Sequence, residues 1–179
     1  MRINLYRLAA ACLLFLILGG GIAKSKPQDQ QFEIKLSAAK TRKYYIDDDQ
    51  GHKSLTKRMY YLNFVKNDRL AKSFRVDKLG RVDPYSYVDS AKVLTYKKVN
   101  NVYYILFWYE CPSNPWNPEH QCGAGTEEYV ASLQLSSNLS ILKIDNQPVY
   151  SCFSNIEKTY TYNKDHPEYG FHLTDTVRY

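Results

Sequence analysis

The sequence predicts a mainly β, single antiparallel domain that follows a cleaved signal peptide. Three observations support this prediction. Tyrosine is unusually frequent, at 17 of the 179 residues, and it favours half-buried pleated surfaces over helix interiors. Short apolar runs alternate with turn residues along most of the chain, which is typical of a sandwich, a meander or a small barrel. The length suits one domain rather than two.

Residues 1–23 have the three parts of a signal peptide. Two arginines form a basic start, an uncharged apolar core covers residues 8–18, and Gly21 and Ala23 supply small residues at the cleavage site. This apolar core is short for crossing about 30 Å of hydrocarbon, so an uncleaved anchor is the weaker interpretation. We therefore expect cleavage before Lys24 and a bacterial protein that is periplasmic or secreted.

Cleavage lowers the positive charge of the chain. The full sequence has a formal charge of +6, and the signal peptide contains Arg2, Arg7 and no acidic residue, so the mature chain carries +4. Its basic residues are dispersed along the sequence rather than grouped in one block. Dispersed charge of this size does not indicate a surface for nucleic acid. We expect no nucleic-acid partner and no stable membrane span after signal cleavage.

The first half of the mature chain predicts a leader and several short strands. Residues 24–31 are polar, which predicts a flexible leader, and the β-rich domain is expected to cover residues 32–179. Residues 32–43 fit one face of a helix and also fit a strand, so both remain open. Residues 58–65 predict a strand, and residues 72–76 predict a short strand that enters a glycine turn.

Two hairpins are predicted in the centre of the domain. Residues 92–99 and 102–109 flank an Asn-Asn pair, which tolerates the left-handed backbone of tight turns. Residues 102–109 form the most hydrophobic stretch of the mature chain and predict a central strand. Residues 127–135 and 139–145 flank a Ser-Ser-Asn turn and predict the second hairpin. Three further short strands are expected at residues 149–153, 158–162 and 171–179.

Three cysteines remain after cleavage, which predicts one disulfide and one odd thiol in an oxidising compartment. If the second hairpin turns at its Ser-Asn pair, facing residues have numbers that sum to about 275, so Cys152 lies opposite Gly123. A bulge beside Pro148 shifts the register by one and favours the disulfide Cys122–Cys152. The alternative pairing, Cys111–Cys122, closes the loop after the central strand and also remains open.

The segment from Cys111 to Glu127 is the main candidate for function. Trp116 lies there among prolines and asparagines, in a loop without apolar periodicity. A tryptophan on a rigid loop is a typical contact for a protein partner or a stacking surface for sugar. The alternative is a lid that folds back on the core. The other binding candidates are Trp108 and Tyr109, which come just before this segment, and His120, which lies within it.

A catalytic interpretation of this segment has less support. Cys122 precedes the string Gly-Ala-Gly, whose backbone amides would form an oxyanion hole if Cys122 were a nucleophile with a histidine base. Exported thiols are usually oxidised, however, and glycines beside a disulfide are explained by a sharp turn. A histidine–carboxylate pair drawn from His120, Glu127 and Glu128 is the other catalytic candidate. Either arrangement would predict an envelope hydrolase.

The sequence therefore predicts an exported, non-enzymatic binding protein, with an envelope inhibitor or immunity-type protein as the narrowest hypothesis. Its partner is expected to be a protein or a glycan of the cell envelope. An envelope hydrolase and a carbohydrate-binding module are the alternative hypotheses. No cofactor and no metal site is expected, because the histidines lack the spacing of zinc ligands.

Overall fold

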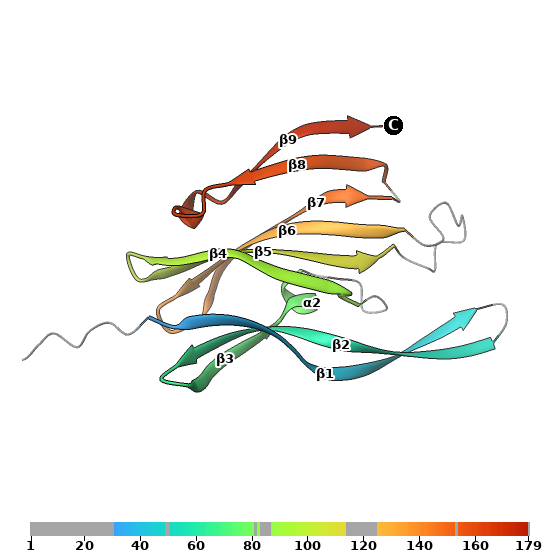
Figure 1. The fold of residues 1–179 in the computed structure, drawn as a ribbon, viewed down its shortest axis with the longest axis horizontal. Helices are drawn as coiled ribbons and strands as arrows, with labels where there is room; N and C mark the ends of the chain where they lie inside the picture. The colour runs from blue at the N-terminus through green and yellow to red at the C-terminus, as the bar shows by residue number, and fades with distance from the viewer. Residues whose placement is uncertain are drawn as a thin grey trace, which may run out of the picture. The chain divides into compact units, whose positions relative to one another are not determined.

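The computed structural model describes residues 31–48, 51–80, 82, 87–113, 125–152 and 154–178. These residues belong to one of the two compact units into which the chain divides, the unit that covers residues 31–179. The predicted signal peptide lies outside the described residues. The described part is mainly β, as the sequence predicts, and its strands form two antiparallel sheets (Figure 1).

The first sheet holds the N-terminal strands in the order β1-β2-β3. β1 (Glu33–Asp48) pairs with β2 (Gly51–Lys66), and β3 (Arg69–Arg75) returns after a turn at Asn67 and Asp68. Both turn residues have positive φ, which Asn and Asp tolerate better than most residues do.

The start of β1 resolves the choice between helix and strand that residues 32–43 left open. Ile34 is buried, and Leu36 packs against the same core. This spacing of two residues is the period of a strand, and the pairing partners on β2 satisfy the backbone of β1. The tertiary pairing therefore outweighs the modest helical pattern of the segment.

A one-turn helix, α2 (Val76–Leu79), follows β3. The backbone N–H of Gly80 closes it by donating to the Val76 carbonyl at 2.8 Å. Val76 and Leu79 are buried in the core between the sheets. The glycine turn that the sequence predicts after residues 72–76 is thus a helical turn, which buries two apolar side chains that an extended segment would expose.

The second sheet contains six strands in sequence order and curls into a half-barrel (Figure 1). It confirms both predicted hairpins and the interior position of the most hydrophobic strand, which lies between its two hairpin neighbours. Asn100 and Asn101 have positive φ at the first turn, as the sequence predicts. The strands are β4 (Ser90–Val99), β5 (Val102–Pro112), β6 (Thr126–Ser136), β7 (Ile141–Ser151), β8 (Ile156–Tyr162) and β9 (Phe171–Arg178).

The register of the β6–β7 hairpin differs from the predicted one. Leu133 faces Ile144, so facing numbers sum to 277 at this point rather than 275. The reason is a longer loop, because Leu139 adopts a φ of 61° and its side chain is buried in the core. The bulge expected beside Pro148 is present, since the pairing with β6 shifts next to it.

The core lies between the two sheets and takes every second residue of β5. Tyr103, Ile105, Phe107 and Tyr109 are buried there, which confirms the alternation predicted for this strand. Phe64 on β2 packs edge-on against the Tyr103 ring of the other sheet, with ring centroids 6.3 Å apart. The opposite face of β5 lines the inside of the curled sheet.

Candidate binding site

The hairpin β8–β9 carries a candidate binding site. Its strands pair from Ile156 and Arg178 to Tyr162 and Phe171. β8 is built almost entirely of threonine and tyrosine after its first residues, which favours a strand. Between the strands lies a short 3-10 helix, η1 (Pro167–Tyr169), which begins at a proline because proline is pre-organised for a first helical turn.

The tip of this hairpin is anchored to β4, which is far away in the sequence. The Thr95 hydroxyl donates to the Lys164 carbonyl at 2.7 Å, and the Lys97 ammonium donates to the Asp165 carbonyl at 2.8 Å. Within the tip, the Asp165 N–H donates to the Asn163 side-chain oxygen at 2.9 Å, which is an Asx turn. These contacts hold the tip of the hairpin in one position.

The tip presents one aromatic ring to solvent. The Tyr169 side chain is 75% exposed, and its ring stacks on the His166 imidazole with centroids 5.2 Å apart. His166 Nδ1 lies 2.9 Å from a carboxylate oxygen of Glu168, and this hydrogen bond lowers the pKa of the Glu168 carboxyl. Tyr169 is therefore supported from behind although it is exposed.

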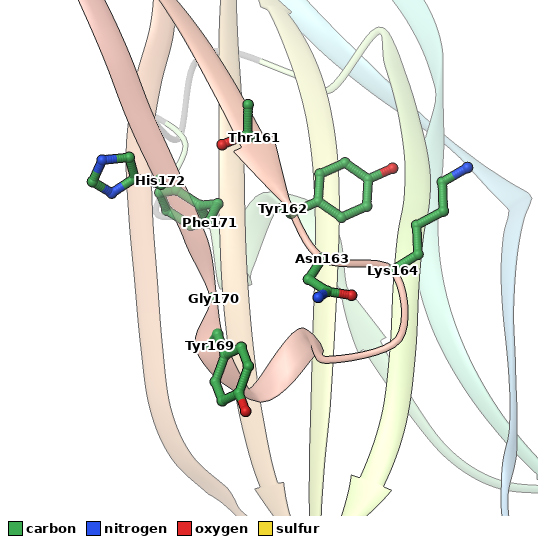
Figure 2. A pocket seen from close by; sticks show the side chains of 8 residues that line it. All are labelled: Thr161, Tyr162, Asn163, Lys164, Tyr169, Gly170, Phe171 and His172. Atoms are coloured by element: carbon green, nitrogen blue, oxygen red, sulfur yellow. The ribbon is translucent and has the colours of Figure 1, made fainter.

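An open pocket of about 500 Å³ adjoins Tyr169 (Figure 2). It combines aromatic rings with polar groups that donate or accept hydrogen bonds, a composition suited to holding a ligand. In Figure 2, the Tyr162 and Lys164 side chains extend to one side of the hairpin and the His172 ring extends to the other. The residues that line the pocket are Thr161, Tyr162, Asn163, Lys164, Tyr169, Gly170, Phe171 and His172.

Trp108, a predicted binding residue, lies half-buried on the face of β5 that points away from the core. Its indole N–H donates to a Glu128 carboxylate oxygen at 3.0 Å, and the Lys92 ammonium lies 4.9 Å from its ring centroid. Burial, together with the nearby Glu128 carboxylate, raises the pKa of Glu110 on the same face. Trp108 thus already has intramolecular partners inside the curled sheet.

Tyr109, another predicted binding residue, is fully buried, so the prediction of a ligand contact there is wrong. Its ring stacks on Tyr129 with centroids 5.0 Å apart. Its hydroxyl lies 2.9 Å from the Asn146 side-chain oxygen and 3.2 Å from the Gly80 carbonyl. Burial raises the pKa of this hydroxyl. The alternation of β5 places Tyr109 on the core face, where it supports the packing of the two sheets.

The described residues include two of the three cysteines, Cys111 and Cys152. Cys111 is a buried free thiol, so the alternative disulfide Cys111–Cys122 does not occur in the structure. Cys152 takes part in a disulfide, and its partner lies outside the described residues. The pairing Cys122–Cys152 therefore stays a prediction. Trp116 and His120 also lie outside the described residues.

The two carboxylates of the catalytic hypothesis point to opposite faces of β6. Glu127 accepts a hydrogen bond from the Ser113 hydroxyl at 3.0 Å, and Glu128 accepts the one from Trp108. Because they are consecutive residues of a strand, they do not converge on one substrate. The other proposed members, His120 and Cys122, lie outside the described residues.

We expect Cys111 to resist alkylation in the folded protein. Burial raises the pKa of its thiol to about 12, and the thiolate is the reactive form. Mass spectrometry after iodoacetamide treatment should find Cys111 unmodified in the native protein and fully modified in denaturant. Fast modification of Cys111 under native conditions would contradict its burial.

Sequence reasoning missed the tip of β8–β9 as a site. The residue pattern predicts only two short strands here, at residues 158–162 and 171–179. The available signal was Tyr169, an aromatic between Pro167 and Gly170 in an otherwise polar loop, which is the same argument that selected Trp116. One tyrosine among 17 does not stand out, whereas one of two tryptophans does.

Comparisons with known proteins add no further constraint on the site. No helix of the described residues is long and apolar enough to cross a membrane. No protein-family model, curated protein or solved structure matches the chain.

Proposed function

We propose that the chain is an exported, non-enzymatic binding protein whose contact surface is the tip of the β8–β9 hairpin. The observation that carries this proposal is Tyr169, which is exposed although it is stacked on His166 and lies on an anchored tip. A ring that is held in place before binding loses little conformational entropy when a partner covers it. Tyrosine is also among the residues that contribute most to protein interfaces.

A protein partner suits this geometry better than a glycan. Tyr169 protrudes from the tip and would enter a cavity on a partner, whereas a sugar usually stacks on a flat aromatic surface. The narrowest form of the proposal is an envelope inhibitor or immunity-type protein. In this proposal the chain is periplasmic or secreted, and Cys122–Cys152 is its disulfide.

A carbohydrate-binding module is the second candidate, and the open pocket supports it. Tyr162 and Phe171 offer ring faces for stacking, and Asn163 and Lys164 offer hydrogen-bond donors. Both candidates use the same hairpin, so one experiment addresses both.

Replacing Tyr169 with alanine is expected to reduce capture of the partner from an envelope fraction by tenfold or more, on the order of 2 kcal/mol for a hot-spot residue. The immobilised mature protein is the bait, and bound material is quantified by mass spectrometry and by sugar analysis. The variant should keep the thermal midpoint of the wild type, because the Tyr169 ring is mostly exposed.

The matched control is Leu70→Ala, which removes another exposed side chain, 61% exposed, from β3 in the other sheet. This control should capture as much material as the wild type. Capture that survives protease treatment of the envelope fraction would favour the glycan. Equal capture by the wild type and Tyr169→Ala would contradict the proposed surface.

A further inference from the structure

β7 has an open edge over most of its length. It pairs with β6 from Ile141 to Ser151, but it pairs with β8 only at its last two residues, Tyr150 and Ser151. Among the described residues, no strand therefore pairs with the outer side of β7 from Ile141 to Val149. Alternate backbone N–H and C=O groups on that side are available to another strand.

The edge strand β4 carries features that discourage pairing with a further strand. β4 contains Lys92, Lys97 and Lys98, is interrupted by a bulge, and binds the tip of the β8–β9 hairpin. Lysines, bulges and covering loops are the usual means of protecting an edge. β7 likewise contains one lysine, Lys143, and a bulge at Leu142, but it exposes Ile141 by 49% and Leu142 by 56%. This edge combines unpaired backbone with exposed apolar side chains.

The charges of β7 are complementary to those of a second copy of the same strand. Lys143 and Asp145 flank Ile144 and lie on one face of the strand. In an antiparallel pairing centred on Ile144, Lys143 of one copy faces Asp145 of the other, and this ion pair occurs twice. Opposite charges that face each other across strands are stabilising.

The length of the open segment also fits this pairing. When the pairing is centred on Ile144, the regular segment of β7 lies between the bulge at Leu142, where the pairing with β6 shifts, and Pro148. Proline has no N–H to donate and is found at edges of sheets. The segment between Leu142 and Pro148 therefore includes both facing pairs of Lys143 and Asp145 in a symmetric pairing.

We propose that two copies of the chain dimerise by antiparallel pairing of their β7 edges, centred on Ile144, in the segment between the bulge at Leu142 and Pro148. The dimer has two-fold symmetry, because the same segment is used by both copies. The pairing joins the two six-stranded sheets through their β7 strands. This inference goes beyond the proposed binding function, and it uses a strand other than those of the β8–β9 hairpin.

The test reverses the facing charges in two single variants, Lys143→Asp and Asp145→Lys. Each variant places like charges opposite each other in its own dimer, so the dimer dissociation constant should rise by about tenfold or more. An equimolar mixture of the two variants restores both opposite-charge pairs and should form a heterodimer. The double variant Lys143→Asp/Asp145→Lys should dimerise like the wild type. Sedimentation equilibrium measures these four samples and the wild type.

Thermal unfolding of each variant checks that the fold is intact. A further variant, Ile141→Lys, adds a charge at an exposed position of the β7 edge and should also weaken the dimer. A wild type that stays monomeric up to about 100 µM would overturn the proposal. So would a dimer whose dissociation constant is the same in all variants, since its contact would then lie on another surface.

Discussion

Replacing Phe64 with alanine is expected to lower the free energy of unfolding by about 3–5 kcal/mol. Phe64 lies on β2, is fully buried, and packs against Phe74 of its own sheet with ring centroids 5.7 Å apart. It also contacts the Tyr103 ring of β5. Removal of the ring would leave a cavity between two sheets that are each held by their own strand pairing. Urea unfolding followed by circular dichroism measures the effect.

The control for this prediction is Leu70→Ala on the neighbouring strand β3. Leu70 is exposed, so its replacement should change the free energy of unfolding by no more than about 0.5 kcal/mol. If Phe64→Ala costs no more than Leu70→Ala, the two sheets do not share a core through Phe64.

Replacing Gly80 with alanine is expected to cost about 1–3 kcal/mol of unfolding free energy, because the new methyl group would overpack the core. A Cβ at this position would lie 2.5 Å from the Tyr109 hydroxyl oxygen and 2.6 Å from the ring carbon that carries it. The Tyr109 ring has little room to move, because it contacts both the Phe107 ring and the Tyr129 ring. Thermal and urea unfolding both measure the loss.

The cause of this loss is tested by a double-mutant cycle with Tyr109→Leu. If the clash is responsible, the cost of Gly80→Ala should shrink when the ring is absent, so the two effects are not additive. Additive effects would instead mean that the cost of Gly80→Ala arises in the backbone and not in a clash with the ring. The φ of Gly80 is −74°, which is ordinary for any residue, so we expect the clash to be the cause.

The local elements of the fold could be predicted from the sequence because their causes are local. The Asn100-Asn101 pair fixes the first hairpin, since both residues adopt the positive φ that asparagine tolerates. The alternation along β5 follows from its apolar pattern. The bulge beside Pro148 follows from the missing N–H of proline.

The parts that depend on distant contacts could not be predicted. The register of the β6–β7 hairpin is set by Leu139, whose burial in the core lengthens the loop. The tip of the β8–β9 hairpin is held by Thr95 and Lys97, about 70 residues earlier in the chain. No local pattern in the sequence indicates either contact, and the site at Tyr169 depends on the second.

The Cys111–Glu127 segment illustrates a different limit of sequence reasoning. Trp108 and Tyr109 are predicted to bind because they lie close to this segment in the sequence. The strand separates them, however, since Trp108 and Tyr109 point to opposite faces of β5. Proximity in sequence therefore gave one residue that faces the inside of the curled sheet and one that belongs to the core.

The most direct test of the proposed binding surface is photo-cross-linking in the producing cells. A photoreactive phenylalanine analogue is incorporated at position 169 in one sample and at position 70 in another, since both positions are exposed. The account predicts a defined adduct with an envelope component from position 169 and none from position 70. Adducts from position 70 without any from position 169 would contradict the assignment of the β8–β9 tip as the contact surface.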